Sequence, residues 1–302
     1  MCGLYGFLNY SGSKIGNLSA LTNSLAKQAA VRGTDATGIA YNDKSKIIIQ
    51  KDAKSAYQIN LNHPDNTVCV TGHTRYATQG NKKQNYNNHP FGGSCENLRF
   101  ALCHNGILNN DNELKKEYQL PKTKIETDSY VAVQLLEKKK LLDFDSVKFM
   151  AETIVGSFAF SILESDNNLW LVRGDSPLSL VHLPNYELYI YASTDEILYK
   201  ALVDTKLFQE IKTGNFEEIK IHSGDIIKIL SNGKIMSDKF NYNEYLGGRK
   251  WWEYDMSGDY DTYVDELKYV ASYQEYSGED VDELLEQGFT TEEIEEYLYC
   301  CE

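Results

Sequence analysis

The sequence predicts an α+β fold built on antiparallel sheets. Short runs rich in β-branched and aromatic residues outnumber helical patterns over residues 1–240, and the two kinds of element do not alternate regularly. Two pairs of these runs are joined by short polar turns, as in β-hairpins. A doubly wound parallel sheet requires a helix between successive strands, so we favour the antiparallel architecture.

The expected strands follow from local composition. Four runs are predicted as separate strands, namely residues 47–49, 67–71, 100–103 and 188–192. One hairpin is predicted between residues 158–163 and 169–172, and another between residues 225–230 and 234–236, where Asn232-Gly233 favours a tight turn. Gly92-Gly93-Ser94 lacks the residues of a phosphate-binding loop and is interpreted as a turn.

Two segments carry a helical pattern, residues 18–31 and 127–140. The second begins with the polar residues Glu126-Thr127-Asp128-Ser129, ahead of apolar residues at helical spacing. One of these polar side chains is expected to cap the first turn.

Length and charge divide the chain into two parts. Its 302 residues are about twice the length typical of one domain, so we expect a large domain with an appendage. Residues 241–302 contain 18 acidic and 3 basic residues, which leaves 26 acidic and 27 basic residues in 1–240. A body with almost no net charge is not expected to bind nucleic acid through its phosphates. We therefore assign residues 2–240 to the domain and residues 241–302 to an acidic, tyrosine-rich tail.

Several classes of protein are disfavoured by composition. No run of about 18 apolar residues is present, so we expect no membrane span. The first residues lack the pattern of a secretory signal, so we expect a cytoplasmic protein. The six cysteines do not have the spacing of a zinc site, and we expect neither a metal nor another cofactor.

Cys2 is the first candidate for chemistry, because it lies next to Met1. If Met1 is removed, Cys2 carries a free α-amine beside its own thiol. The amine titrates near about 8 and the thiol near about 8.5, so the amine can accept the thiol proton. The alternative is a small buried thiol at the start of a strand.

Four further segments strengthen the first interpretation: residues 32–38, 72–80, 104–106 and 126–128. Together with Met1-Cys2-Gly3 they resemble the class II glutamine amidotransferase domain, an N-terminal-nucleophile hydrolase that amidophosphoribosyltransferase and glucosamine-6-phosphate synthase carry. The resemblance extends over about residues 2–237, in the family's order. It implies a four-layer αββα fold, to which the tail adds a small helical acidic appendage.

The resemblance implies hydrolysis of the side-chain amide of L-glutamine to glutamate and ammonia through a thioester on Cys2. It assigns the donors for the oxyanion to the Asn105 side chain and the Gly106 backbone N–H. Taken alone, an Asn-Gly pair favours a hairpin turn. Within the complete set of motifs we favour the oxyanion role.

Recognition of glutamine also follows from the resemblance. Arg75 matches the residue that binds the α-carboxylate, and Asp128 matches the residue that pairs with the α-ammonium. Asp128 could also be the helix N-cap. His73 is expected to be a structural histidine. Other family positions are occupied by Thr78 and His89, expected to line the pocket, and by Arg32, Asp35 and Tyr76, expected to support the site.

The acceptor of ammonia is less well defined than the thiol chemistry. Tyr76 is shared with the amidophosphoribosyltransferase type, whereas Gln79 replaces a histidine of the glucosamine-phosphate synthase type. About 65 residues follow Met236, too few for a synthase domain, so we expect a freestanding subunit that passes ammonia to a separate synthase or ligase protein. The alternatives are a γ-glutamyl amide hydrolase without a partner and a non-catalytic binding protein on the same scaffold.

The tail differs from the body in composition. It holds 10 of the 22 tyrosines and two of the three tryptophans, Trp251 and Trp252. Two short helices are predicted over residues 281–286 and 291–298, with Gly288 closing the first. The tail could dock a partner or pack on the body, and we favour docking because aromatic and acidic residues together suit an interface with a basic protein.

Overall fold

The computed structural model describes residues 2–12, 15–44, 46–96, 98–203, 205 and 207–242, and towards the C-terminus residues 264, 267–268, 271, 276–291 and 293–294. The chain divides into two compact units, Met1–Tyr242 and Asn243–Glu302, which are described separately. Our assignment of residues 2–240 as the functional domain is retained as a proposal.

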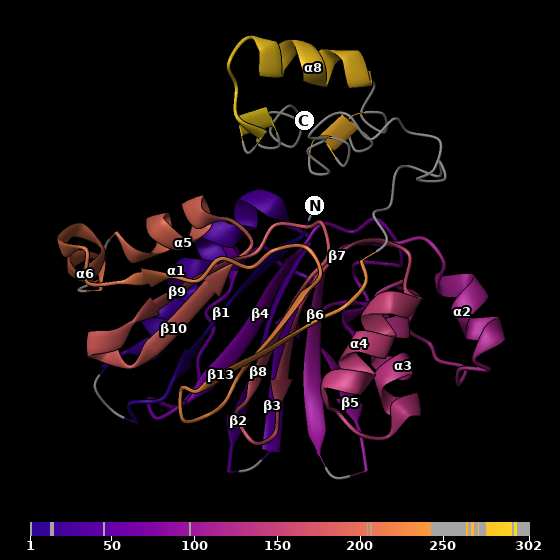
Figure 1. The fold of residues 1–302 in the computed structure, drawn as a ribbon, viewed down its shortest axis with the longest axis horizontal. Coiled ribbons are helices and arrows are strands. Elements are labelled where there is room, and N and C mark those ends of the chain that lie inside the picture. Colours follow the sequence, from indigo (N-terminus) through magenta and orange to yellow (C-terminus); the bar gives the residue numbers. More distant parts are fainter. Residues whose placement is uncertain are drawn as a thin grey trace. The chain divides into compact units, whose positions relative to one another are not determined.

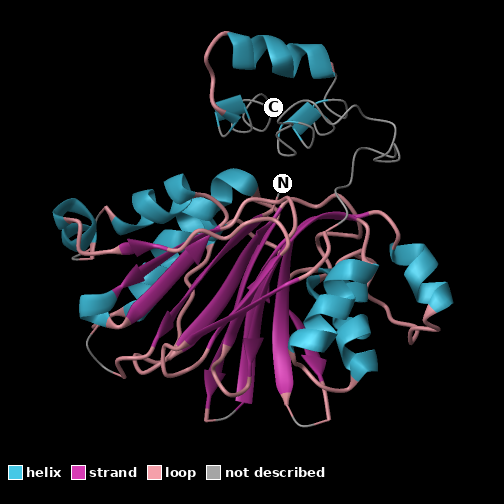
Figure 2. Ribbon diagram, viewed as in Figure 1, coloured by secondary structure: helices cyan, strands magenta, loops and turns pink. Residues whose placement is uncertain are grey.

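The first unit contains two antiparallel sheets (Figures 1 and 2). The seven-stranded sheet has the order β11-β9-β10-β1-β4-β2-β3, and the six-stranded sheet has the order β13-β12-β8-β7-β6-β5. The first sheet consists of β1 (Gly3–Asn9), β2 (Ala36–Asp43), β3 (Lys46–Asp52), β4 (Cys69–Arg75), β9 (Ser179–Leu183), β10 (Leu188–Ala192) and β11 (Glu217–Glu218). The second consists of β5 (Phe91–Ser94), β6 (Arg99–Leu108), β7 (Gly156–Glu164), β8 (Leu169–Arg173), β12 (Asp225–Ile229) and β13 (Ile235–Lys239).

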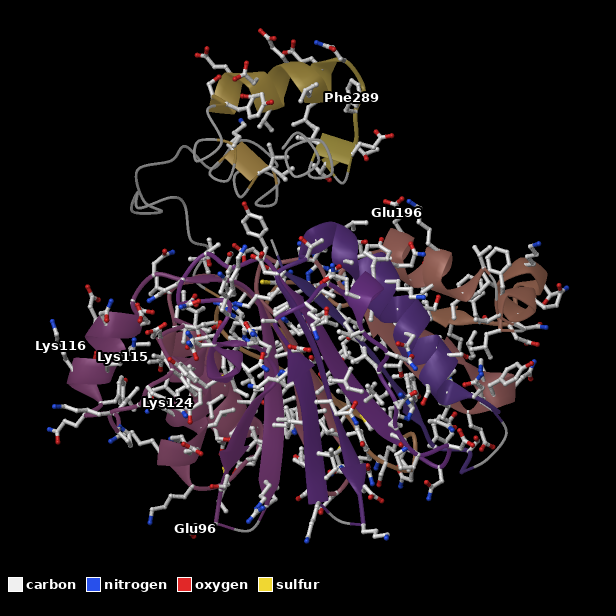
Figure 3. All side chains as sticks on the ribbon, turned by 180° about the vertical axis from the view of Figure 1, so that it is seen from behind. Glu96, Lys115, Lys116, Lys124, Glu196 and Phe289 are labelled. Atoms are coloured by element: carbon white, nitrogen blue, oxygen red, sulfur yellow. The ribbon has the colours of Figure 1, made fainter. Side chains whose placement is uncertain are left out.

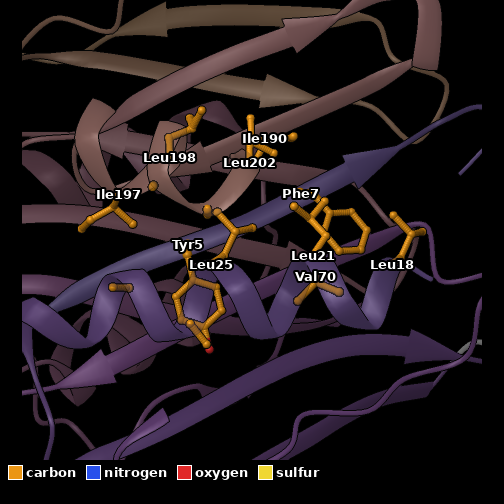
Figure 4. Packing of buried hydrophobic residues seen from close by; sticks show 14 of the residues in the cluster. Tyr5, Phe7, Leu18, Leu21, Leu25, Val70, Ile190, Ile197, Leu198 and Leu202 are labelled. Carbon is orange, nitrogen blue, oxygen red and sulfur yellow. The ribbon is translucent and has the colours of Figure 1, made fainter. Parts of the chain in front are cut away.

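Helices cover the outer face of each sheet. α1 (Leu18–Ala29) and α5 (Asp195–Leu202) pack on the seven-stranded sheet, and Figure 4 shows Leu21, Leu25 and Leu198 among the buried residues there. α3 (Tyr130–Lys139) and α4 (Phe144–Thr153) contact β5 and β12 of the other sheet. The remaining helices of this unit are α2 (Asp111–Glu117) and α6 (Phe208–Thr213).

In addition to the apolar clusters between each sheet and its helices, another apolar cluster lies where the two sheets face each other. It includes Leu4 of β1, Ala40 of β2 and Ala159 of β7, all fully buried. Charged side chains such as Glu96, Lys116 and Lys124 instead point outward and are exposed (Figure 3). The unit therefore has the four layers αββα, which confirms the predicted fold class.

Local sequence explains where the two predicted helices begin and end. α1 starts after Asn17, whose side chain accepts a hydrogen bond from the Ala20 N–H, and it continues as a 3₁₀ turn, Ala30–Arg32. α3 is shorter than predicted, and the residue before it is Ser129, whose side chain makes no capping bond. The interpretation of Asp128 as a helix cap is therefore wrong, because its carboxylate accepts from the backbone of Leu108 instead.

Two segments considered as turns lie in strands, which excludes the turn alternative for Asn105-Gly106 and corrects the turn interpretation of Gly92-Gly93-Ser94. Asn105 and Gly106 lie inside β6, opposite Ala159 and Phe158 of β7, so they do not form a hairpin turn. Gly92-Gly93-Ser94 belongs to strand β5. A Cβ atom on Gly93 would lie 2.3 Å from the Phe100 ring, so glycine there permits close packing of neighbouring strands.

In the second unit, α8 (Gly278–Glu286) contains the first predicted tail helix. Ser277 and Asp280 form a reciprocal capping box at its start, and Gly288 adopts φ +93 after its end. Of the second predicted helix, residues 291 and 293–294 are helical, and the others lie outside the described residues, as do Trp251 and Trp252. Within the described residues, no helix combines the length and apolar character needed to cross a bilayer.

Candidate active site

Cys2 directly precedes β1 and is half-buried. Because β1 pairs with β4, Gly3 lies opposite Thr74, and this register brings the end of β4 beside the thiol. Cys2 Sγ lies 3.5 Å from the Tyr76 carbonyl oxygen. Burial raises the pKa of the Cys2 thiol, whereas the hydrogen bond to Tyr76 and the positive charge of Arg75 act to lower it.

Arg32 and Asp35 hold the segments on either side of this contact. Arg32 Nε donates to the Cys2 carbonyl oxygen at 2.9 Å. The Asp35 carboxylate accepts from the Ala77 N–H at 2.9 Å and from Lys82 Nζ at 2.5 Å, while the Asp35 N–H donates to the Arg75 carbonyl oxygen at 2.9 Å. The two residues therefore fix the backbone around the thiol.

Asn105 is fully buried in β6, and neither its side-chain oxygen nor its nitrogen has a hydrogen-bond partner in the described structure. Leaving such a group unsatisfied costs about 1–3 kcal/mol, so an unpartnered buried amide is a candidate for binding a ligand. Strand β6 contacts β1, the strand that Cys2 precedes, and β4 across the inter-sheet space.

Gly106 adopts φ +129, a conformation that L side chains rarely adopt. A Cβ atom at this position would lie 2.1 Å from the Ser157 carbonyl oxygen. Both the backbone conformation and the space therefore require glycine next to Asn105.

Arg75 is buried, with only 3% of its surface exposed, and its guanidinium is held by the loop that follows β4. Nη1 donates to Asn88 Oδ1 at 2.6 Å, and Nη2 donates to the carbonyl oxygens of Gln79 at 2.5 Å and Gly80 at 3.4 Å. A guanidinium has five N–H groups, so two remain beyond these three bonds within the described structure.

Asp128 is also buried, and its negative charge acts on the Arg75 guanidinium. Its Oδ2 accepts from the Leu108 N–H at 2.7 Å, and its Oδ1 accepts from the Ser129 hydroxyl at 3.3 Å. Burial lowers the pKa of Arg75, and the negative charges of Cys2, Asp35 and Asp128 oppose that shift. The structure therefore gathers the thiol, the guanidinium and the carboxylate into one electrostatic neighbourhood.

The two residues expected to line the pocket lie in different surroundings. Thr78 is exposed in the loop after β4. His89 is buried, precedes a cis peptide bond to Pro90, and neither of its ring nitrogens has a hydrogen-bond partner in the described structure. Its ring lies 4.1 Å from the His73 ring, and burial lowers the pKa of both imidazoles.

His73 is a hydrogen-bonded histidine of the interior, because its Nε2 donates to the His104 carbonyl oxygen at 2.9 Å. Sequence reasoning missed two residues that shape the site, Asn88 and Lys51. Asn88 directly precedes His89, so the sequence pointed to this segment through His89 but not to the contact between Asn88 and Arg75. Lys51 gave no signal in the sequence.

Among the described residues, no group of three or more His, Cys, Asp and Glu side chains could hold a metal ion.

Comparisons with known proteins show which proteins this chain is similar to. The family model described as a glutamine amidotransferase domain matches residues 73–200. Glutamine–fructose-6-phosphate aminotransferase (isomerizing) of Fusobacterium nucleatum is 33% identical over 251 residues, which cover 79% of this chain and 37% of the relative. The protein of the same name from Staphylococcus epidermidis is 32% identical over 188 residues, 59% of this chain and 30% of the relative. The chain thus spans about a third of the length of these relatives.

Solved structures share the fold at lower identity. Glutamine phosphoribosylpyrophosphate amidotransferase from B. subtilis, complexed with ADP and GMP, superposes with a TM-score of 0.63 at 21% identity, covering 80% of this chain and 50% of that chain. An allosteric regulatory enzyme of purine biosynthesis gives 0.62 at 22% identity, with the same coverage. The fold, the motifs around Cys2 and these similarities identify a class II glutamine amidotransferase domain in this chain, with an N-terminal-nucleophile hydrolase fold.

Proposed function

We propose that this chain hydrolyses the side-chain amide of L-glutamine through a thioester on Cys2 and supplies the ammonia for an amidotransferase reaction. The observation that carries the proposal is the buried Asn105 amide, which has no hydrogen-bond partner among the described residues and lies next to Gly106, where a Cβ atom would clash with the Ser157 carbonyl oxygen. These are the features required of a preorganised site for an oxyanion.

The proposed reaction begins when Cys2 Sγ forms a bond to the side-chain carbonyl carbon of glutamine. The carbonyl electron pair moves to oxygen, where Asn105 Nδ2 and the Gly106 N–H donate to it. Collapse of this intermediate breaks the carbon–nitrogen bond, and the nitrogen leaves as ammonia after it takes a proton. Water then attacks the thioester, the carbon–sulfur bond breaks, and glutamate and the thiol are released.

The proton carrier in this scheme is the α-amine of Cys2, which requires that Met1 be removed. The amine accepts the thiol proton in the first step and donates a proton to the departing nitrogen. Burial raises the pKa of the Cys2 thiol, so the thiol needs a neighbouring base that accepts its proton.

Recognition of glutamine is proposed to rest on Arg75 and Asp128. The guanidinium has two N–H groups left after its bonds to the protein, and these can donate to the α-carboxylate. Asp128 carries the opposite charge for the α-ammonium, and its Oδ2 already orients the end of β6. His89 and Thr78 are retained as proposed lining residues, and Tyr76, Arg32 and Asp35 as supporting residues.

We also propose that the ammonia acceptor is a synthase or ligase on a separate protein. The curated relatives are named as aminotransferases of fructose-6-phosphate, and this chain spans 37% of the first of them. The test is whether the purified full-length chain, mixed with proteins that co-purify with it, transfers nitrogen from labelled glutamine to a new product.

The test of the glutaminase activity uses the full-length chain and L-glutamine, with glutamate and ammonia measured in equal amounts. Intact mass should show a chain that begins at Cys2, and a glutamine-analogue diazoketone should label Cys2. Cys2→Ala should abolish both reactions and keep the fold. If neither hydrolysis nor labelling occurs in the wild type, the proposal is wrong. If the wild type releases amine only from other γ-glutamyl amides, those amides and not glutamine are the substrate.

A further inference from the structure

The residue concerned is Lys51, a half-buried lysine on β3 that the proposed reaction does not use. We propose that Lys51 is a positioning residue that holds Arg75 in place for the α-carboxylate of glutamine, through the Asn88-His89-Pro90 segment. This inference rests on the proposed recognition of glutamine by Arg75.

The lysine contacts the segment at both ends. Lys51 Nζ donates to the Asn88 carbonyl oxygen at 2.5 Å and to the Pro90 carbonyl oxygen at 2.9 Å. The ammonium also lies 5.0 Å from the centre of the Phe91 ring, within the range of a cation–π contact. One side chain therefore clamps the backbone before and after His89.

Asn88 connects this clamp to the substrate-binding residue. Asn88 is fully buried, and its side-chain oxygen accepts the bond from Arg75 Nη1 at 2.6 Å. Its side-chain nitrogen donates to the Lys82 carbonyl oxygen at 3.1 Å and to Asn85 Oδ1 at 3.2 Å. Asn88 thus accepts a hydrogen bond from Lys51 on its backbone oxygen and one from Arg75 on its side-chain oxygen. A shift of this backbone therefore also moves the guanidinium.

The His89 ring does not hold the segment by hydrogen bonds, because both of its nitrogens are without partners in the described structure. It makes ring contacts with His73 at 4.1 Å and Phe91 at 4.3 Å. Ring contacts are less directional than charge-assisted hydrogen bonds, so the two bonds from Lys51 define where the backbone lies.

The strand next to Lys51 leaves room for this arrangement. Gly38 of β2 lies opposite Lys51, and a Cβ atom on Gly38 would lie 2.3 Å from the His89 carbonyl oxygen and 2.7 Å from the Lys51 Cβ. The glycine lets the Asn88-His89-Pro90 segment pass directly over the sheet, where the lysine can reach it.

The surroundings of the ammonium favour carbonyl oxygens over an ion pair. No carboxylate forms an ion pair with Lys51 among the described residues. The titratable and charged groups that interact with it among the described residues are Arg75 and His73 from β4, His89 from the segment, and Cys103 from β6. Burial lowers the pKa of Lys51 to about 8, with the nearby charge of Arg75 acting in the same direction and Cys103 opposing it.

The test compares wild type with Lys51→Met, which keeps the length of the side chain and removes the donors. The KM for L-glutamine should rise about ten- to a hundredfold, the effect expected when a binding group moves by about 1 Å, while kcat stays within about threefold. The matched control is Lys54→Met, because Lys54 is an exposed lysine two residues beyond the end of β3 whose side chain forms an ion pair with Asp52. It should match wild type.

A second substrate separates positioning from general damage. L-glutamine α-amide lacks the carboxylate, so its kcat/KM should be the same for Lys51→Met and wild type. Alkylation of Cys2 by iodoacetamide should also proceed at an unchanged rate. Lys51→Gln is used in the same comparison if Lys51→Met does not fold.

Two results would overturn the inference. One is an unchanged KM for L-glutamine in a folded Lys51 variant, and the other is an equal loss with L-glutamine and its α-amide. Failure of the proposed function has a different signature, because the wild type itself would then neither hydrolyse L-glutamine nor react with its analogue.

Discussion

Asp128 Oδ2 accepts a hydrogen bond from the Leu108 N–H at 2.7 Å, two residues beyond Gly106 on the same strand. The carboxylate proposed to pair with the substrate ammonium is therefore also a structural anchor for the strand that carries the proposed oxyanion donors. One side chain serves both tasks, and substitutions can separate them.

Asp128→Asn keeps an oxygen that can accept from Leu108 but removes the charge. We expect the KM for glutamine to rise about 10- to 150-fold, the equivalent of the 1.5–3 kcal/mol of a hydrogen bond to a charged group. The melting temperature should stay near that of wild type. Asp128→Ala should lose the same recognition and also about 1–3 kcal/mol of stability, because the buried Leu108 N–H is left without an acceptor. Equal melting temperatures for the two variants would show that the anchor is unimportant.

Asn105→Ala should affect turnover and stability in opposite ways. Loss of one oxyanion donor lowers kcat about 10²–10³-fold, with a smaller change in KM. The Asn105 side chain makes no hydrogen bond in the described structure, so its removal relieves an unsatisfied buried amide. Steady-state kinetics and thermal unfolding of the same variant check this pair of outcomes. A large drop in melting temperature with normal kcat would mean that the amide is structural.

Gly106→Ala should destabilise the domain as well as inactivate it. The added methyl would lie 2.1 Å from the Ser157 carbonyl oxygen, and φ +129 is unfavourable for alanine. Gly92→Ala is the matched control within the same sheet, because its nearest heavy atom, on the Ile49 side chain, would be 3.4 Å away. Comparison of the two melting temperatures tests the prediction, and a stable, active Gly106→Ala would exclude the proposed backbone donor geometry.

The fold and the grouping of motifs were predictable, whereas the contacts that lock them together were not. Hairpin signals at residues 158–172 and 225–236 correspond to β7–β8 and β12–β13, because turn chemistry is local. The bond between Arg75 and Asn88 spans 13 residues and that between Lys51 and Asn88 spans 37, so no local pattern indicates them. Helix α4 was missed although Asp143 and Ser146 form a capping box, a signal that the sequence does contain.

The glycine-rich segment at β5 shows why composition misled the strand assignment. Glycine is poor in strands unless another group needs the space, and here the Phe100 ring occupies it. That requirement belongs to tertiary packing and is invisible in the segment itself.

The buried histidines predict how stability depends on pH. Burial lowers the pKa of His73 to about 3 and that of His89 well below its usual range, so both are neutral in the folded protein near pH 7. As the pH falls below about 6.5, the unfolded chain binds protons that the folded chain does not, and stability decreases by up to about 1.4 kcal/mol per pH unit for each such group. Urea unfolding between pH 7 and pH 5 measures this slope.

His89→Phe isolates one of these groups. The variant should keep its stability at pH 7, because neither ring nitrogen of His89 has a hydrogen bond to lose in the described structure, and its dependence on acid should be weaker than that of wild type. An unchanged slope would show that His89 does not titrate between the two states as proposed.

The acidic tail is proposed to dock a basic partner, and the structure shows where to divide the chain. Strand β13 ends at Lys239. The buried Phe240 and the half-buried Tyr242 pack on Phe158, with their ring centres 5.8 and 5.5 Å from that of Phe158. A chain that ends at Ser237 would cut the strand and lose both rings, so the body must be kept through Tyr242.

We expect a chain ending at Asn243 to stay folded and to keep its glutaminase activity. It should lose any partner whose binding weakens with salt, since residues 241–302 carry 18 acidic and 3 basic residues. Co-purification at low and high salt measures the loss, with the chain ending at Ser237 as a destabilised control. If the chain ending at Asn243 is insoluble, inactive, or still holds the partner, the tail is not the docking element.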